Sequence, residues 1–182
     1  MRLFYLLLIC FFGSSVGYAQ PIYEVKRGKV NFHSEAPQEL ISAESADVKG
    51  VVDISKKAFA FKISIPSFLG FNSPLQREHF NENYMESNIF PEATFRGKVI
   101  EDIDYTKEGV YTVRAKGKLS IHGIEKERII KSQITIKSGS MRIKSDFTVL
   151  LYDHDIKIPR VVSEKLAQEI QVSLTADLKP AK

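Results

Sequence analysis

The chain has 182 residues, 43% of them hydrophobic and 26% charged, with a formal net charge of +4. This length is typical of one domain, and acids are interleaved with the bases throughout, which excludes the concentrated basic face of a nucleic-acid-binding protein. The single cysteine, Cys10, excludes internal disulfide bonds.

The N-terminus has the pattern of a secretory signal. Arg2 precedes an unbroken apolar run over residues 3–12, and Gly17-Tyr18-Ala19 puts small residues at the −3 and −1 positions of a cut before Gln20. The apolar run is too short to cross a bilayer, which needs about 20 residues. We therefore expect residues 1–19 to be a signal peptide that is removed, and residues 20–182 to be one exported domain that is periplasmic or secreted.

The remaining chain is dominated by alternation of apolar and polar residues. In residues 109–122, for example, Val113, Ala115 and Leu119 alternate with charged or polar neighbours. Because successive side chains of a strand point to opposite faces, each such segment has one apolar and one wet face, as in an antiparallel sheet. The expected strands number eight or nine, depending on how residues 39–56 divide: 22–33, 39–47, 50–56, 58–66, 92–104, 109–122, 125–138 with 140–153, and 168–178.

Three short segments between strands predict turns. They are Lys107-Glu108-Gly109, His122-Gly123 and Ser138-Gly139-Ser140. Each contains a glycine, which can adopt the positive φ angle that tight hairpin turns require.

Residues 67–91 interrupt the alternation. Ser73, Pro74 and Gln76 match an N-cap, a first-turn proline and a capping-box partner, which predicts a helix over residues 74–85. A second short helical turn is expected over residues 160–167. Seven of the nine phenylalanines downstream of the signal lie between Phe59 and Phe95, so the insertion must bury several of them over one end of the sheet, either around a ligand or as a structural plug.

These elements predict an all-β fold, an eight-stranded antiparallel barrel with a helical cap inserted between strands. Closure removes the exposed edges that long strands would otherwise leave. Ala115 and Gly117 face the interior, where they either leave volume for a ligand or make room for large neighbours. If they leave volume, leucine at position 117 should fill the lumen without unfolding the barrel. At about 25 Å tall, such a lumen suits a long, thin apolar molecule.

Catalytic and metal-binding patterns are sparse. The four histidines are scattered, and no glycine-rich phosphate loop or nucleophile elbow occurs. Asp153-His154-Asp155 is the densest polar cluster, but adjacent strand residues point to opposite faces, which favours a turn at a strand end over a metal site. His79 could form a hydrogen bond with the head group of a ligand, or it could be a structural residue. We expect no enzyme activity, cofactor or metal.

Two motifs resemble the YceI-like family. Phe90-Pro91-Glu92-Ala93-Thr94-Phe95, following the predicted helix, resembles the family's "Pro-x-x-Thr-Phe" entry into a strand, and residues 117–124 resemble its "G-x-L-T-I-H/R-G-V" hairpin. Tyr23-Glu24-Val25 departs from the family's usual opening. The resemblance implies a lipocalin-like eight-stranded barrel with an apolar interior, in a periplasmic protein that binds polyisoprenoids, including isoprenoid quinones.

The leading hypothesis is a carrier or sequestering protein for a polyisoprenoid or similar apolar lipid. The alternatives are a structural or envelope-stress protein with a packed barrel and an enzyme acting on such a lipid through His79 or the Asp153–Asp155 cluster. We expect no nucleic-acid partner and no membrane-spanning segment, and a homodimer is a further expectation. The residues expected to line the lumen and its mouth are Phe61, Ile63, Phe95, Ala115, Gly117, Leu119, Phe147, Val149 and Val172, with Phe68, Phe71, Phe80 and Tyr84 at the mouth.

Overall fold

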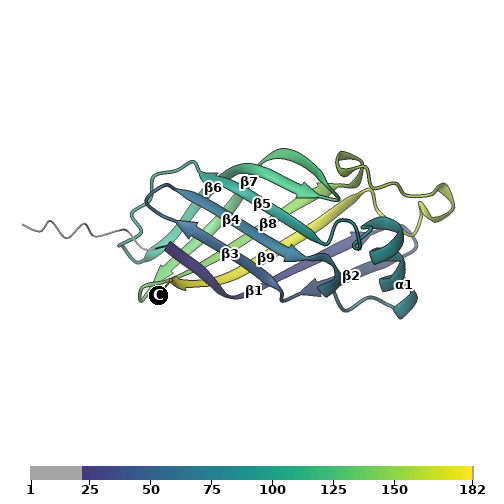
Figure 1. Ribbon diagram of the computed structural model, residues 1–182, viewed down its shortest axis with the longest axis horizontal. Helices are drawn as coiled ribbons and strands as arrows, with labels where there is room; N and C mark the ends of the chain where they lie inside the picture. The colour runs from purple at the N-terminus through teal and green to yellow at the C-terminus, as the bar shows by residue number, and fades with distance from the viewer. Residues whose placement is uncertain (1–21, 182) are drawn as a thin grey trace, which may run out of the picture.

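The computed structural model describes residues 22–181, and the expected signal peptide lies outside them. Nine strands, all antiparallel to their neighbours, form one sheet (Figure 1). The strands are β1 (Ile22–Glu35), β2 (Leu40–Ser45), β3 (Val48–Asp53), β4 (Ala58–Ser64), β5 (Glu92–Val99), β6 (Gly109–Ile121), β7 (Ile124–Lys137), β8 (Ser140–Leu150) and β9 (Glu169–Pro180).

The sheet closes into a barrel because β1 pairs with the last strand as well as with its sequence neighbours. β1 pairs with β9 from Tyr23 to His33, and on its other side with both β2 and β3. The register of β2 continues into β3 without a shift, since Val30 faces Ser45 and Glu24 faces Val51. β2 and β3 therefore act as one interrupted strand, which confirms the predicted closed barrel of eight strands.

Two of the three predicted turns are tight hairpins. His122 and Gly123 both have positive φ angles, as do Ser138 and Gly139, and each pair joins strands that are in register up to the turn. Two central residues with positive φ are the geometry of the type I′ turn, whose twist matches that of paired strands. The third segment does fall in the connection between the antiparallel strands β5 and β6. That connection is a longer loop, however, and Gly109 has no positive φ and begins β6.

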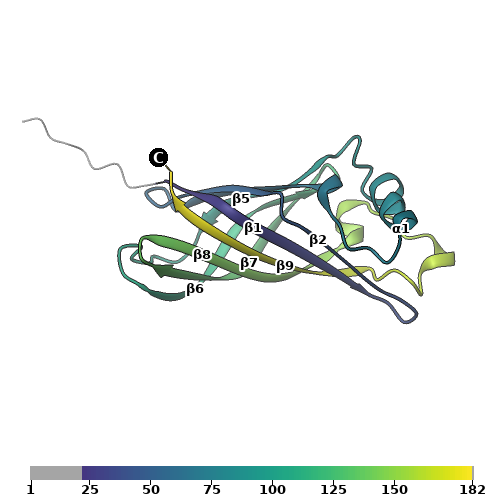
Figure 2. The ribbon, with the colours of Figure 1, turned by 90° about the horizontal axis from the view of Figure 1, so that it is seen from below.

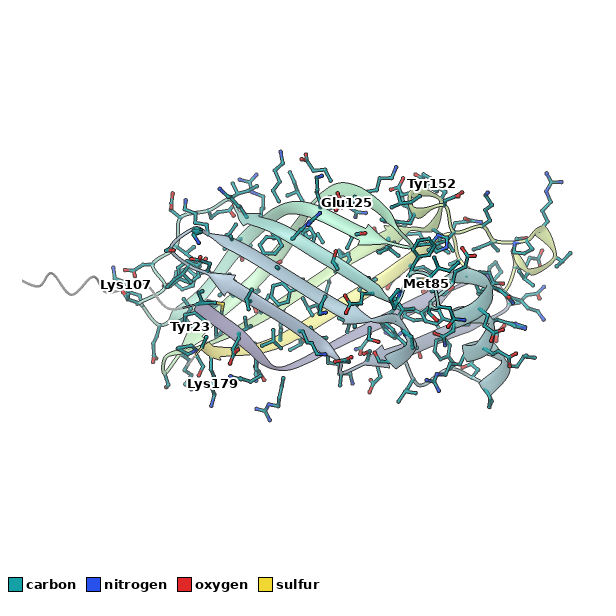
Figure 3. All side chains as sticks on the ribbon, in the orientation of Figure 1. Tyr23, Met85, Lys107, Glu125, Tyr152 and Lys179 are labelled. Carbon is teal, nitrogen blue, oxygen red and sulfur yellow. The ribbon has the colours of Figure 1, made fainter. Side chains whose placement is uncertain are left out.

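The strand predicted over residues 92–104 ends at Val99. Residues 100–108 instead form a loop, in which Ile103 and Tyr105 pack against the buried core at that end of the barrel. The hydroxyl of Tyr105 is buried, and this burial raises the pKa of the Tyr105 phenol. These side chains and Tyr111 pack against the buried cluster that contains Tyr23. Tyr23 and Lys107 lie at the same end of the barrel (Figure 3), which we call the closed end.

The predicted helix is present between β4 and β5. It begins after Ser73, whose side chain accepts a hydrogen bond from the Gln76 amide, as the capping pattern predicted. The α-helix α1 (Pro74–His79) then continues as a π-helical turn, η2 (Phe80–Tyr84). A short 3₁₀ turn, η4 (Arg160–Val162), falls within the predicted second helical segment. Both α1 and the β8–β9 connection lie at one end of the barrel, opposite the C-terminus (Figures 1 and 2).

The buried residues form two clusters at the two ends. The cluster at the closed end includes Tyr23, Val52 and Phe59, and its most buried members, Ala176 and Leu178, come from β9. The other cluster joins Ala43 on the barrel wall to Phe68 and Met85 of the insertion. The insertion is therefore attached to the barrel by its own apolar core, and we call residues 65–91 the cap.

Candidate functional site

A cavity of about 620 Å³ occupies the barrel between the two clusters. Its wall is almost entirely apolar and includes the inward-facing residues of most strands. At the closed end it reaches Val52, Ile134 and Ile143, and at the other end it reaches Leu75 of α1 and Leu166 of the β8–β9 connection. The cavity therefore runs along the barrel axis and ends beneath the cap.

Twelve of the thirteen residues expected around the lumen line this cavity. Strand alternation had placed eight of them on the inner face, and the other four were expected at the mouth because they belong to the phenylalanine-rich insertion. Their role in binding stays a prediction. The twelve are Phe61, Ile63, Phe68, Phe71, Phe80, Tyr84, Phe95, Ala115, Leu119, Phe147, Val149 and Val172.

Gly117 is the exception and does not line the cavity. It faces Gly97 across β5 and β6, and a Cβ atom at position 117 would lie 2.3 Å from the carbonyl oxygen of Arg96. A glycine fits there because the backbones of β5 and β6 approach closely. The expectation that leucine at this position fills the lumen and spares the fold is therefore wrong, because its first carbon would meet backbone.

Four phenylalanines form one aromatic cluster beneath the cap. The ring of Phe80 stacks on Phe32 of β1 with centroids 5.4 Å apart, and it also contacts Phe68 and Phe71 at 5.8 and 5.1 Å. The cluster joins the cap to the barrel wall and lines the cavity at the same time. The same residues of the insertion therefore plug the barrel end and form part of the cavity surface.

Polar and charged groups of the cavity wall concentrate at the cap end. The Glu39 carboxylate accepts hydrogen bonds from Gln76 at 3.0 Å and from Asn72 at 3.3 Å, which ties the β1–β2 connection to α1. His79 and Lys165 are exposed there and also line the cavity. Burial raises the pKa of the Tyr84 phenol. We call this end, where cap and connections meet, the mouth.

Two polar side chains lie deep in the barrel instead. Ser132 of β7 and Ser145 of β8 face each other, and their hydroxyl oxygens are 2.7 Å apart. Both residues are buried and both line the cavity. They are the polar exception in an apolar layer.

The Asp153-His154-Asp155 segment is a turn at a strand end, as the alternation indicated. It belongs to the 3₁₀ turn η3 (Leu151–His154), and Asp155 pairs with Lys157 on the surface. His154 is fully buried, and this burial lowers the pKa of its imidazole. None of the three residues lines the cavity, and within residues 22–181 no three His, Cys, Asp or Glu side chains are grouped to hold a metal ion.

A polar bridge connects the cap to the β6–β7 hairpin. The Nδ1–H of His122 donates to the carbonyl of His154 at 3.1 Å, and its Nε2 lies 2.7 Å from the Glu86 carboxylate. The His122 ring also meets Phe90 edge-on, with centroids 4.7 Å apart. This bridge attaches the cap to the side of the barrel opposite β1, to which the aromatic cluster attaches it.

The sequence reasoning missed several lining residues, among them Phe32, Ile41 and Leu174. Phe32 follows the same period-two rule as the others, with Val30 and Ser34 on its face, but a register shift between Val25 and Arg27 disturbs the pattern earlier in β1. Alternation also put Ser145 on the apolar face of its strand. A serine at such a position is a signal of a polar lumen site that was available from the sequence.

The fold is shared with solved structures. A polyisoprenoid-binding domain from Saccharophagus degradans superposes with a TM-score of 0.74 at 11% identity, covering 89% of this chain and 100% of that one. Burkholderia cenocepacia BcnA gives 0.67 at 14% identity, covering 82% and 95%, and the Campylobacter jejuni YceI protein gives 0.56 at 14%, covering 100% and 99%. Such low identities establish the fold only.

Sequence comparison is decisive for the family. No curated protein matches the chain, whereas the YceI-like domain matches residues 24–178, nearly the whole described barrel. The chain therefore belongs to the YceI-like family, as its two motifs indicated.

Proposed function

We propose that this barrel binds a polyisoprenoid or an isoprenoid-quinone-like lipid in its lumen and acts as a carrier or sequestering protein. The observation that carries the proposal is the apolar cavity of about 620 Å³ inside the barrel. It falls within the range of about 300–1,000 Å³ typical of small-molecule sites. The relative from Saccharophagus degradans, described as a polyisoprenoid-binding domain, supports the ligand class.

Binding would depend on burial of apolar surface. Each methylene moved from water into such a lumen contributes about 0.8 kcal/mol, so a chain of several isoprene units gains affinity without any ionic contact. Aromatic side chains from the barrel wall and cap, including Phe61, Phe95 and Phe80, provide the flat apolar contacts. A branched, flexible isoprenoid can follow this curved wall, which favours it over a compact polar metabolite.

Two observations support binding over the alternatives. A structural barrel packed shut would have no reason to keep a cavity of this size, because unfilled apolar space costs stability. An enzyme would need reactive groups at the cavity, yet the most buried histidine, His154, does not line it. His79 does line the mouth but is exposed, which suits a surface contact with a ligand end better than proton transfer in a dry site.

The test is to purify the protein from its own host and measure its mass under native conditions, followed by organic extraction. The native host is used because expression in another host could load a different lipid. We expect an extractable isoprenoid lipid at close to one molecule per chain. The same measurement gives the oligomeric state, which addresses the predicted homodimer. An empty protein from the native host would contradict the carrier proposal.

A pair of variants links binding to the cavity. Ala93, on the inner face of β5, lines the lumen and is only partly buried. Ala93→Phe should therefore fill part of the lumen and reduce binding of a short-chain ubiquinone. Lys98→Phe adds the same ring to the exposed outer face of the same strand and serves as the matched control. Equal binding by both variants would place the ligand outside the barrel.

Export is a separate part of the proposal. The N-terminal pattern supports cleavage before Gln20 and delivery to the periplasm or beyond, and within residues 22–181 no helix is long and apolar enough to span a membrane. The intact mass of the protein from a periplasmic extract should correspond to a chain beginning at Gln20. Full-length protein retained in the cytoplasm would contradict this.

A further inference from the structure

The serine pair at the deep end of the cavity is polar where the surrounding wall is apolar. Ser132 and Ser145 are 8% and 6% exposed, and their neighbours on the same inner face, such as Ile134 and Phe147, are apolar. Within residues 22–181, the only side-chain hydrogen bond of either hydroxyl is the one that joins them. The hydrogen bond between them contributes to the pairing of β7 and β8. Alanine at both positions would nevertheless avoid the cost of burying two hydroxyls, which makes the pair a candidate contact for a ligand.

The pair lies close to the floor of the cavity. Ile134 and Ile143, the next inward-facing partners toward the closed end, still line the cavity, whereas Ile136 and Met141, one step further, are buried in the core and do not. Toward the mouth, Ser145 precedes Leu150, the last residue of β8, by five residues, or about 17 Å of strand, and Leu151 beyond it still lines the cavity. A ligand that reaches the serines must therefore occupy most of the length of the lumen.

The two hydroxyls have unused hydrogen-bonding capacity. Each has one proton and two acceptor lone pairs. When one hydroxyl donates to the other, the proton of the acceptor hydroxyl is still available, and so are lone pairs on both oxygens. The pair can therefore donate one hydrogen bond to a ligand oxygen and also accept one from a ligand hydroxyl.

Charge restricts which ligand group can lie there. The charged residues of the cavity wall in the described chain are Glu39, Lys62 and Lys165. Glu39 and Lys165 belong to the mouth, and Lys62 pairs with Glu92 on the outer face of β4. Among the described residues of the cavity wall no other lysine or arginine is present. A phosphate or carboxylate buried beside the serines would therefore lose its hydration without a counter-ion from this wall, at high cost.

We propose that the ligand enters the barrel head first, with an uncharged oxygen-bearing head group hydrogen-bonded to Ser132 and Ser145 and its isoprenoid tail extending to the aromatic cluster at the mouth. This inference depends on the proposed function, since it specifies the head group and direction of the lipid bound there. Quinones, phenols and alcohols fit the site. A prenyl phosphate does not.

The test compares two probes on one double variant, Ser132→Ala with Ser145→Ala. A short-chain ubiquinone has carbonyl oxygens, and squalene is an isoprenoid hydrocarbon without a head group. Loss of the serine hydrogen bond should weaken ubiquinone binding about fivefold and leave squalene binding unchanged or tighter. In infrared spectra, a quinone carbonyl band lowered by hydrogen bonding in the wild type should return toward its free position in the double variant.

Two controls separate the role of the hydroxyls from general effects on packing. Ser145→Thr keeps a hydroxyl and should keep the lowered carbonyl band. Ser87→Ala removes another buried serine, one that does not line the cavity, and it should leave the carbonyl band unchanged.

The outcomes distinguish the two proposals. If wild type binds both probes, but the double variant binds ubiquinone equally well with the same carbonyl band, the head-first proposal is overturned and the lipid-binding barrel stands. If the wild type binds neither probe, the proposed function itself fails. If a prenyl phosphate binds as tightly as ubiquinone and the double variant weakens it equally, the restriction to uncharged head groups is wrong.

Discussion

The space around the backbone determines which glycines of this barrel can be replaced by a residue with a side chain. A Cβ on Gly117 would lie 2.3 Å from the Arg96 carbonyl oxygen and 3.0 Å from the Cα of Gly97. Gly139, in the β7–β8 turn, has a φ of +68° but no atom within 4 Å of the added carbon. A side chain at position 117 is opposed by the packing of two backbones. A side chain at position 139 is opposed by the backbone conformation alone.

Gly117→Ala is expected to lower the free energy of unfolding by about 2–3 kcal/mol, because the strand pair must separate to admit the methyl group. Gly139→Ala should cost only about 1 kcal/mol, the strain of a positive φ. Urea denaturation of both variants measures the difference. Equal losses would mean that the β5–β6 contact can relax freely.

His154 makes stability depend on pH. Burial lowers the pKa of its imidazole below the usual 6.5, the value expected in the unfolded chain. As the pH falls through about 6.5, the unfolded state takes up a proton that the folded state does not, so stability decreases until the lowered folded pKa is reached. Above 6.5 the histidine is neutral in both states and contributes no pH dependence.

We therefore expect the free energy of unfolding to fall between about pH 7.5 and 5.5, by no more than about 1.4 kcal/mol per pH unit, the limit for one proton. His154→Asn should lose that part of the slope. Carboxylates with lowered pKa, such as Asp177 beside Arg142, titrate at lower pH and do not overlap this window. If stability depends on pH equally in wild type and in His154→Asn, other groups cause the pH dependence.

At the scale of elements, the cap is held by packing rather than by its own helix. α1 has six residues, and an isolated helix of that length is unstable in water. Its N-cap, Ser73, defines where it starts, but Phe80 connects it to Phe32 on the barrel. The Glu86–His122 contact provides the second attachment.

Phe80→Ala is expected to loosen the cap without unfolding the barrel, because the cap and the closed end have separate cores. Arg77, exposed in α1, provides a trypsin site that is cleaved only when the cap opens locally. Cleavage at Arg77 should be several times faster in Phe80→Ala, and unchanged in Glu82→Ala, an exposed position of the same π-helical turn. Equal rates in both variants would show that the aromatic cluster does not hold the cap.

For the whole molecule, the cavity couples ligand binding to stability. A barrel with about 620 Å³ of apolar space lacks packing contacts that a ligand would supply. Because a ligand bound only by the folded state stabilises it by mass action, we expect short-chain ubiquinone at about 100 times its Kd to add about 2.7 kcal/mol. In a chain of this size, that raises Tm by about 5–10 °C. A Tm that is independent of ubiquinone concentration would contradict lumen binding.

Local patterns were sufficient to predict most of the barrel. Period-two alternation assigned an inner face to several strands because that period depends only on backbone geometry, and so it identified lining residues such as Phe61, Ala115 and Val172. The His122-Gly123 and Ser138-Gly139 turns and the Ser73 cap were also predictable, since each depends on a few neighbouring residues. The family motifs lie in the same local segments.

Only the tertiary structure determined which residues meet across strands. Gly117 has the alternation of a lumen residue, but the pairing of β5 with β6 brings it against Gly97 and the Arg96 carbonyl. Ser132 and Ser145 become a pair because the β7–β8 register aligns them. Burial of His154 and the stacking of Phe80 on Phe32 likewise join segments far apart in the chain. The sequence by itself therefore determined the barrel and its apolar inner face, while the closed register decided how the cavity is bounded and where its polar groups lie, because those contacts exist only once the strands are paired.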